Sequence, residues 1–490
     1  MKRLLFLLLF AATLEARPIA FINVNVIPMT SDAILTKQVV IVDDGKIVTV
    51  GKEGEVAIPE DAQRIDGEGG YLLPGLADLH VHVTQPDDLS LFVANGVTTV
   101  FNLSGDDGIL AMRKSTRLMP RLFTTGKQLI GVQTADRARQ IVGEEATAGY
   151  DGIKIYNDIS FEALGALIAE AHAKGMLAVG HIPRNLRWQD MLAAKPDAIA
   201  HAEEFLYSPV LDGDVEKIVA GMKDGGIALI TTLITYDMIG RQVGDVETQL
   251  DRGESRYVNP AIRRLWKRSR NHYVLDFKPS RVPNFRRLLG FQKQLIKLLD
   301  AGGVPILVGT DAGGVPFVIP GFSAIEELRE LVSSGLTPYH ALRGATIEAA
   351  QFLRKDAGFG TIEPGKAADL LLVRGNPLSD IDNIALRAGV MIRGRWLDNT
   401  ALHAELERIA AANRDDEDIV RALATGGVGA AIKLAGAKKT RDTTLNELAY
   451  QLLLIDKQRE DALKLFRANV ALHPESFTAR ESLQEVRSLP

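Results

Sequence analysis

The chain has 490 residues, which is too long for one ordinary domain and suggests about three. Apolar residues make up 46% of it, so it can bury a large core. Its net charge of −5, with both signs interspersed, argues against a nucleic-acid-binding or membrane-surface protein. The lack of cysteine excludes disulfides, thiolate metal ligands and a cysteine nucleophile.

The N-terminus has the pattern of a secretory signal peptide over residues 1–16. Lys2 and Arg3 precede a short apolar run at residues 4–12, which is far below the roughly 20 residues of a membrane span. Leu14 and Ala16 suit cleavage before Arg17. The pattern predicts a periplasmic or secreted protein. An uncleaved anchor or an intrinsic first strand is the alternative reading.

Two blocks of short strands, residues 17–73 and 357–400, flank the middle of the chain. β-Branched residues run or alternate in AFINVNVIPM, KQVVIVDDGKIVTVGK and AQRIDGEGGYLLPG, and again in GTIEPGKAADLLLVRG and AGVMIRGRWLD. Asp-Gly and Gly-Gly pairs break the first block into short segments. We expect the two blocks to pair into one composite β-sandwich.

Residues 74–356, between these blocks, repeat an apolar strand, a loop and a helix. The strand candidates are GLADLHVHV, VTTVFNL, RLFTTG, DGIKIY, LAVGHI, AIAHAEE, ALITTLIT and PILVGTDAG. Helices such as SFEALGALIAEAHAKG intervene, with apolar residues at three-to-four spacing and a glycine C-cap at Gly175. Eight such units over about 280 residues predict an α/β fold built on a (β/α)8 TIM barrel.

The connection between the seventh and eighth strand candidates, residues 237–300, is long enough to cover a pocket. Much of it, residues 252–297, is locally basic. This charge predicts either a solvated helix face or a lid that attracts anionic substrates.

The C-terminal part, residues 401–490, is expected to be α-helical. Residues 445–476 resemble one tetratricopeptide repeat, with Ala462 and Phe466 at the repeat's spacing and Pro474 after them. One repeat cannot bury its own apolar face. We therefore expect it to dock on the barrel or on a second copy in a homo-oligomer. Binding of a partner protein is the alternative.

Histidines and one aspartate stand at the ends of the strand candidates. His80 and His82 are one residue apart, so strand alternation turns both side chains the same way. His181 and His201 end the fifth and sixth candidates, and Asp311 ends the eighth. The carboxyl ends of barrel strands meet on one rim, so these side chains are expected to converge. Together they suit Zn²⁺, although each alone is compatible with ordinary hydrogen bonding.

Lys154, in the fourth strand candidate DGIKIY, is the exception in this set. A lysine is a cation at neutral pH and is repelled by two divalent metals. Carboxylation by CO₂ would convert its amine to a carbamate, an anion whose two oxygens can bridge two metals. The carbamate, Asp311 and a bridging hydroxide would then nearly balance the metal charge. The alternative is a rim lysine paired with Asp151 or Asp158.

Five separated motifs, DLHVH, GIKIY, VGHIP, IAHAEE and GTDAG, occur in one order, with LLPGLADLH and GKAADLLL in the flanking blocks. On these motifs the chain resembles the amidohydrolase superfamily over residues 19–397, in its two-metal members with a bridging lysine. The resemblance assigns one ion to His80, His82 and Asp311, the other to His181 and His201, and the bridge to Lys154. Two Zn²⁺ ions are expected, although Mn²⁺ and Co²⁺ accept the same ligands.

Within the superfamily, the GIKIY and VGHIP pair is similar to imidazolonepropionase-related and prolidase-like members. Related dipeptidases often have a histidine after the third strand, but FTTGKQLIGVQT, residues 123–134, has none. This departure weakens the case for a dipeptide substrate, with Lys127 or Gln128 as candidate substitutes. A secretion signal also fits poorly with a cytosolic imidazolonepropionase.

The expected reaction is hydrolysis of a carbon–nitrogen bond by a metal-activated hydroxide. Asp311 would accept the proton and pass it to the leaving nitrogen as general base and acid. Tyr156, Tyr207 and Tyr236 follow strand ends and are candidates to bind the substrate; alternatively, each packs against a loop. A G-x-S-x-G nucleophile motif is absent, which argues against a covalent serine route.

These features predict a metal-dependent amidohydrolase that acts on a small molecule or short peptide, as a prolidase-like dipeptidase or an N-acyl amino acid amidase. A lactonase or carbamate hydrolase on the same centre is one alternative. The other is a catalytically silent barrel whose C-terminal helices bind a partner. Neither nucleic-acid binding nor a membrane span is expected.

Overall fold

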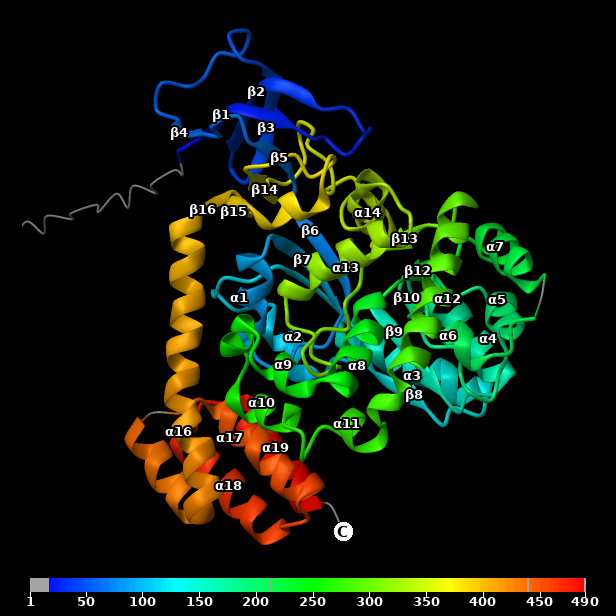
Figure 1. Ribbon diagram of the computed structural model, residues 1–490, viewed down its shortest axis with the longest axis vertical. Helices are drawn as coiled ribbons and strands as arrows, with labels where there is room; N and C mark the ends of the chain where they lie inside the picture. The colour runs from blue at the N-terminus through cyan, green and yellow to red at the C-terminus, as the bar shows by residue number, and fades with distance from the viewer. Residues whose placement is uncertain (1–16, 212, 439, 489–490) are drawn as a thin grey trace, which may run out of the picture.

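The molecule consists of a mixed β-sheet, a barrel of parallel strands and a group of C-terminal helices (Figure 1). This computed structural model describes residues 17–211, 213–438 and 440–488. The predicted signal peptide, residues 1–16, lies outside the described residues. The predicted fold class is confirmed: a TIM-like barrel has flanking strands on one side and a helical segment at the C-terminus.

The mixed sheet joins strands that lie on both sides of the barrel in the sequence. They are β1 (Ile19–Val26), β2 (Leu35–Asp43), β3 (Lys46–Lys52), β4 (Gln63–Asp66), β5 (Tyr71–Pro74), β14 (Leu370–Val373), β15 (Arg387–Ile392) and β16 (Arg395–Asp398). Their order is β16-β15-β14-β5-β1-β2-β3, with β4 beside β1. Antiparallel pairing of β14 with β5 makes the two sequence blocks one hydrogen-bonded sheet.

Eight parallel strands form the barrel in sequence order. They are β6 (Leu76–Val81), β7 (Val97–Asn102), β8 (Arg121–Ile130), β9 (Gly152–Asn157), β10 (Leu177–Gly180), β11 (Ala198–Ala200), β12 (Ala228–Ile230) and β13 (Ile306–Leu307). The chain after β13 adjoins β6, because Leu79 N–H donates to Val308 O at 2.8 Å and His82 N–H to Ala312 O at 2.7 Å. These bonds close the barrel.

Helices surround the barrel strands. They are α1 (Pro86–Ala94), α2 (Asp107–Met112), α3 (Ala135–Ala148), α4 (Phe161–Ala173), α5 (Trp188–Ala194), α6 (Glu204–Tyr207), α7 (Asp214–Gly225), α13 (Phe322–Ser333), α14 (Pro338–Gly344) and α15 (Ile347–Phe352). In α4 the Ser160 hydroxyl accepts from a backbone N–H of the first turn. Leu164 and Leu167 are buried on its inner side, and Gly175 follows its end at φ +72°.

The prediction for the seventh strand is wrong beyond residue 230. β12 ends at Ile230, and residues 233–235, which the predicted strand included, begin a helix instead. Thr232 has a φ of +51°, which turns the chain out of the sheet. The buried carboxylate of Glu327 then accepts the N–H groups of Leu233 and Ile234 at 3.0 and 2.7 Å, which fixes the helix start.

A long insertion separates β12 from β13. It contains α8 (Leu233–Gly244), α9 (Val246–Leu250), η1 (Gly253–Tyr257), α10 (Pro260–Trp266), α11 (His272–Asp276), η2 (Pro279–Arg281) and α12 (Val282–Ala301). Several of its basic residues, such as Lys278 and Arg286, are exposed to solvent, as a solvated face requires, and others form ion pairs. Arg263 pairs with Glu417 at 2.8 Å, and Arg270 pairs with Asp456 at 2.9 Å. Part of the basic charge of the insertion therefore binds acidic residues of the C-terminal helices.

After η3 (Ile381–Ala385) and β16, the chain ends in helices. They are α16 (Asn399–Lys438), α17 (Asp442–Tyr450), η4 (Gln451–Ile455), α18 (Arg459–Leu472) and α19 (Phe477–Ser488). α16 runs from the sheet, past the barrel, to the other C-terminal helices (Figure 1). Ala462 and Phe466 are buried in a core that includes Ala261 of α10, so the repeat-like segment docks on the barrel's insertion.

Among the described residues, α16 is the one helix long and apolar enough in composition to cross a membrane. It is kinked at Gly427, which has a φ of +73°. Ile419, Leu423 and Ala431 of α16 are buried in the core of the C-terminal helices. That side of the helix is therefore covered by protein.

Candidate metal centre

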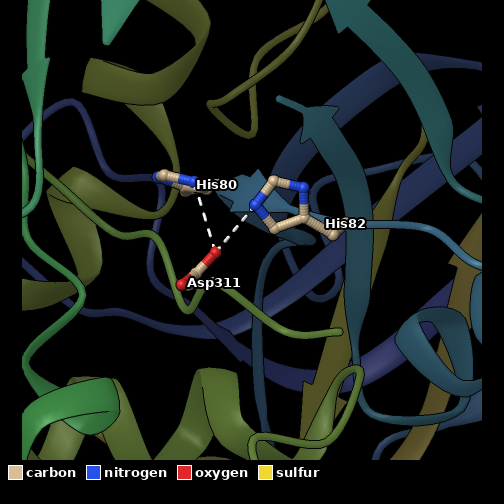
Figure 2. A group of neighbouring side chains, drawn as sticks. All are labelled: His80, His82 and Asp311. Atoms are coloured by element: carbon tan, nitrogen blue, oxygen red, sulfur yellow. Dashed lines mark ion pairs between the residues drawn. The ribbon is translucent and has the colours of Figure 1, made fainter. Parts of the chain in front are cut away.

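His80, His82 and Asp311 form a compact group at the carboxyl end of the barrel (Figure 2). One donor atom from each lies within 4.8 Å of the others. Asp311 Oδ1 is 2.9 Å from His82 Nε2 and 3.4 Å from His80 Nε2. The group offers two imidazole nitrogens and one carboxylate oxygen close enough to bind the same ion. These are ligand types of Zn²⁺ and related divalent ions.

The backbone explains why these groups meet. His80 lies in β6, and His82 follows its last residue by one position. Asp311 follows β13, and its φ of +59° turns the chain sharply at the rim. Asp78 joins the two strands, because its buried carboxylate accepts the Thr310 hydroxyl at 2.6 Å and the Thr310 N–H at 3.0 Å. This bond holds the residue before Asp311 in place.

The other predicted ligands lie beside this group. The Lys154 amine, on β9, is fully buried and 3.4 Å from His80 Nε2. His201 has its ring centroid 4.4 Å from that of His80 and 4.6 Å from that of His181. The structure therefore brings all six predicted residues into one cluster. The six side chains lie in or just after five different barrel strands, and only the end of β6 supplies two of them.

Two further side chains orient the rings of His181 and His201. His181 Nδ1 donates to Glu204 Oε1 at 2.8 Å, and a hydrogen bond of 2.8 Å joins His201 Nδ1 to Thr232 Oγ1. These bonds leave the Nε2 atom of each ring for another ligand. Metal-binding histidines are usually held this way, through the nitrogen that does not touch the metal. The residues present therefore fit a metal centre.

Glu204 is itself firmly held. It is completely buried, and its Oε2 accepts from the Arg184 guanidinium at 2.6 Å and from the Ile182 N–H at 2.9 Å. It lies in the IAHAEE motif, but sequence reasoning gave it no role. The signal that could have found it is the rule that a metal-binding histidine needs a carboxylate or carbonyl partner.

Burial sets the electrostatics of the cluster. It lowers the pKa of His80, His181 and His201 well below their ordinary values, with neighbouring positive charge acting in the same direction. Burial also lowers the pKa of Lys154 to about 8. Neutral imidazoles and an amine that gives up its proton readily are the forms that bind metal or react with CO₂.

Asp311 behaves in the opposite way. Burial alone would raise the pKa of its carboxyl, but a hydrogen bond from His82 and the positive charge of nearby groups hold the pKa below its ordinary value. The group is therefore a carboxylate at neutral pH. It can accept a proton, as the sequence-based role requires.

The predicted tyrosines lie at different places. Tyr156 contacts the cluster directly, with its ring centroid 4.6 Å from that of His181. Tyr207 is half exposed, with the Arg184 guanidinium 4.0 Å from its ring centroid, and Arg184 in turn binds Glu204 rather than a predicted ligand. Tyr236 lies on α8 and packs edge-on against Phe285. Tyr156 is therefore the best placed of the three to meet a substrate.

Tyr273 is a further phenol near the centre. It comes from α11 in the insertion, and the charges of Asp311 and Glu203 act on it and help burial to raise its pKa. Sequence reasoning missed it, because nothing in the insertion's sequence shows which residues reach the rim. Lys127 and Gln128, considered above as substitutes for a missing histidine, line a separate cavity beside α3.

Comparison with known proteins agrees with this geometry. The model of the family described as "Amidohydrolase family" matches residues 71–397. The chain belongs to the amidohydrolase family. This confirms the resemblance found in the five sequence motifs.

Curated relatives of this amidohydrolase include an adenine deaminase from Desulforamulus reducens, 24% identical over 74% of this chain. An imidazolonepropionase from Idiomarina loihiensis is 26% identical over 71% of this chain and 90% of its own length. The chain spans only about half the length of the adenine deaminases that it matches, 55% in the example above. These names therefore indicate a range of possible reactions.

Similar solved structures confirm the fold. A Xaa-Pro dipeptidase with bound methionine is 20% identical, has a TM-score of 0.63, and is covered over its whole length by 78% of this chain. A bottromycin amidohydrolase is 23% identical with a TM-score of 0.65, matching 81% of this chain and 91% of its own. A putative prolidase from Bifidobacterium longum is 24% identical with a TM-score of 0.61, matching 80% and 99% of the two chains.

Proposed function

We propose that this amidohydrolase hydrolyses a carbon–nitrogen bond with two divalent ions, most simply Zn²⁺. The ions would be held by the rim cluster, which consists of His80, His82, Lys154, His181, His201 and Asp311. The observation that carries the proposal is the arrangement of His181 and His201. Glu204 and Thr232 hold the Nδ1 atoms of His181 and His201, so that both Nε2 atoms remain for a ligand beside the His80–His82–Asp311 group. The position of both rings beside that group distinguishes them from His340, whose Nδ1 also contacts a carboxylate, that of Asp300 at 3.0 Å.

Lys154 would bridge the two ions as a carbamate. Its amine is fully buried among imidazoles, with its Nζ only 3.4 Å from His80 Nε2. No described carboxylate forms an ion pair with it, and neither Asp151 nor Asp158 is its partner. A buried ammonium in that place is costly, whereas a carbamate supplies negative charge where two cations would bind.

The ions would polarise the substrate carbonyl and lower the pKa of a bound water. Asp311, a carboxylate at neutral pH, would accept the proton of that water and deliver it to the leaving nitrogen. Tyr156 stands against His181, where its hydroxyl can position the substrate.

The proposed substrates are small molecules or short peptides, with prolidase-like dipeptides and N-acyl amino acids as the leading classes. The fold relatives with dipeptidase and amidohydrolase descriptions support this range. The curated relatives add purine and cyclic-amide substrates as competing classes. The N-terminal sequence supports action in the periplasm or outside the cell.

Metal analysis and an activity screen test the proposal together. We expect purified full-length protein to carry about two divalent ions per chain, to lose activity on chelation, and to regain it with Zn²⁺, Mn²⁺ or Co²⁺. The screen should include dipeptides, N-acyl amino acids, adenine and lactones. Full activity in metal-free protein would overturn the proposal, and turnover restricted to lactones would change the bond that is cleaved.

The variant Lys154→Ala tests the bridge. It should hold clearly fewer than two ions per chain and lose at least about 100-fold in kcat, since both ions share the bridging group. Lys127→Ala, at an exposed lysine outside the cluster, is the matched control and should keep both properties. Two ions with normal turnover in Lys154→Ala would show that the bridging assignment is wrong.

A further inference from the structure

A cavity of about 370 Å³ lies next to the metal residues. Its lining includes Thr84, two positions after His82, and Gly313 and Gly314, which follow Asp311. A Cβ added to Gly314 would come within 2.7 Å of Asp311 Oδ1, so this part of the wall lies directly against the proposed proton acceptor. The volume falls in the range of small-molecule sites.

Most of the cavity wall is apolar. Ile262, Leu265 and Trp266 of α10 form one side, and Val315 and Val318 from the loop after β13 form another. An apolar group that enters such a cavity leaves water for apolar contacts, and the charged side chains in the lining, Asp88 and Arg270, are already bound to other residues. The wall therefore favours an apolar part of a substrate.

Another apolar side chain of the cavity wall, Ile455, comes from the C-terminal helices. It is half exposed and lies at the end of η4, a single π-helical turn. Such turns are rare and often mark functional sites. An exposed isoleucine in a π turn at the edge of a cavity is difficult to explain as core packing.

η4 is attached to the helix that lines the same cavity. Gln451 Nε2 donates to Ala261 O at 2.7 Å, and the Arg264 guanidinium donates to Gln451 Oε1 at 2.7 Å. Asp456, directly after Ile455, pairs with Arg270 at the cavity rim at 2.9 Å. These contacts fix the position of Ile455 relative to α10.

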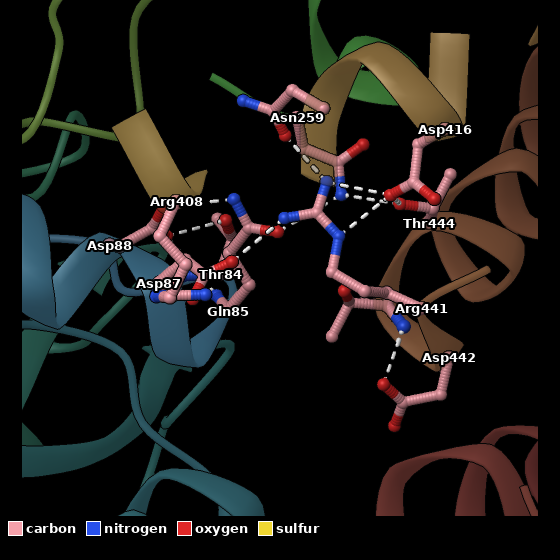
Figure 3. A network of polar contacts seen from close by, with 12 residues as sticks. Thr84, Gln85, Asp87, Asp88, Asn259, Arg408, Asp416, Arg441, Asp442 and Thr444 are labelled. Atoms are coloured by element: carbon pink, nitrogen blue, oxygen red, sulfur yellow. Dashed lines mark hydrogen bonds and ion pairs between the residues drawn. The ribbon is translucent and has the colours of Figure 1, made fainter. Parts of the chain in front are cut away.

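A second set of contacts holds the C-terminal helices to the segment after the first metal motif (Figure 3). Asn259 of the insertion donates to Gln85 Oε1 at 3.0 Å and to Thr444 Oγ1 at 2.9 Å. All three side chains are buried. The cavity is thus assembled from the barrel rim, the insertion and the C-terminal helices, which have a fixed arrangement.

We propose that this cavity binds an apolar side chain or acyl group of the substrate, and that Ile455 of the C-terminal helices sets the preference for it. The inference rests on the proposed hydrolase function, which it deepens by naming the substrate class: amides that carry a medium-sized apolar group next to the scissile bond. The C-terminal helices then belong to the catalytic unit as a specificity element.

The test compares Ile455→Asp with Leu454→Asp in the full-length, metal-loaded protein. Leu454 is the adjacent residue, is similarly exposed, and is not part of the cavity lining, so it is a matched control. Substrates are N-acetylated amino acids and dipeptides that differ only in an alanine, valine, leucine or phenylalanine side chain. Metal content is measured for every variant, to show that the centre is intact.

We expect the wild type to prefer leucine or phenylalanine over alanine in kcat/KM. Ile455→Asp should reduce this ratio at least about 10-fold, because small changes in an apolar pocket alter selectivity on that scale. Leu454→Asp should leave the ratio unchanged. Ile455→Val, which keeps an apolar side chain, should have nearly the wild-type ratio. Turnover with an unchanged ratio in Ile455→Asp would overturn the inference and leave the proposed function standing.

A binding measurement separates the two proposals if no compound in the series is turned over. Calorimetry with N-acetyl-leucine amide and N-acetyl-alanine amide, in the Asp311→Asn background, reports on the cavity alone. Tighter binding of the leucine compound that is lost with Ile455→Asp supports the cavity's role even where the proposed reaction has failed. Equal binding of both compounds by the parent protein would overturn the inference.

Discussion

At the scale of single residues, the rim cluster shows how each proposed ligand depends on a second side chain. Asp78 holds Thr310 and so places Asp311, Thr232 holds His201, and Glu204 holds His181. Thr232, His201 and Asp311 all have positive φ angles, of +51°, +76° and +59°. Left-handed backbone at non-glycine residues costs energy, so the surrounding contacts must hold these three residues in place.

Glu204→Gln tests this dependence. The amide would place an N–H₂ group where two donors, His181 Nδ1 and the Arg184 guanidinium, now meet oxygen. We expect the affinity for the second metal to fall about 10- to 100-fold, as for other partners of metal-binding histidines. Metal titration followed by elemental analysis measures the change.

Glu170→Gln is the control for that variant. Glu170 belongs to a loose surface pair with Lys174, at 3.6 Å, and should not affect metal binding. Retention of both ions at unchanged affinity in Glu204→Gln would mean that His181 needs no carboxylate partner, and it would weaken the two-metal assignment.

At the scale of elements, the sequence predicted the barrel well because its strands carry dense apolar, β-branched runs. It overestimated the lengths of β11 and β13, which have only three and two residues, and underestimated that of β8, which has ten. It also extended the seventh strand into α8, because residues 228–235 form a continuous apolar and β-branched run without a visible turn signal. The helix start depends on Glu327, almost a hundred residues away, and such long-range contacts override local propensity.

In the candidate metal centre, too, the sequence predicts some of the residues and misses others. His80, His82, His181, His201 and Asp311 could be predicted, because each stands at the end of a recognisable strand. Tyr273 could not, since it reaches the centre from an insertion whose path depends on packing against other elements. The roles of Glu204 and Thr232 also depend on contacts across strands. Sequence reasoning therefore finds groups fixed by strand geometry and misses those fixed by tertiary contacts.

Glu327→Ala tests how strongly one carboxylate organises α8. Glu327 lies on α13 and is fully buried, and it accepts the Thr231 hydroxyl at 2.5 Å besides the two N–H groups of α8. Its removal leaves buried donors without partners, so we expect a loss of about 2–4 kcal/mol in the free energy of unfolding. Urea unfolding measures the loss, and hydrogen exchange should show the first turn of α8 opening.

The control for this variant lies on the same helix. Arg329 pairs with Asp382 at the surface, and both side chains are about half exposed, so Arg329→Ala should cost less than about 1 kcal/mol. Similar losses in the two variants would show that the helix start is held by other contacts.

At the scale of the whole molecule, the C-terminal helices are bound to the barrel by a buried ionic network (Figure 3). Asp87, which follows the first metal motif on α1, accepts from Arg408 and Arg441 at 2.8 Å each. Arg441 also pairs with the buried Asp416 at 2.6 Å. The network joins residues more than 300 positions apart, so the barrel and the C-terminal helices form one structural unit.

The same network predicts a pH dependence of stability. Burial opposes ionisation of Asp87, but the guanidinium groups of Arg408 and Arg441 prevail and lower its pKa below the ordinary value of 3.8. A carboxyl whose pKa is lower in the folded than in the unfolded state stabilises the fold above its ordinary pKa. This contribution is lost as the pH falls through the lower, folded-state pKa.

Asp87→Asn removes the charge while keeping the shape, and leaves Arg117, Arg408 and Arg441 facing a neutral amide. We expect a loss of about 1–3 kcal/mol near pH 7, because charge-assisted hydrogen bonds to a buried carboxylate are lost, although Arg117 and Arg408 stay in contact with solvent. The gap from the wild type should be constant from pH 8 to about 5 and narrow below pH 4, since the wild type then loses the same charge. Urea unfolding across this pH range measures the gap, and hydrogen exchange of α17 and α18 reports whether the C-terminal helices loosen first. Asp418→Asn, in an exposed pair with Lys438, should leave the free energy of unfolding nearly unchanged across the pH range. A gap for Asp87→Asn that is equally small would mean that apolar packing alone holds the C-terminal helices to the barrel.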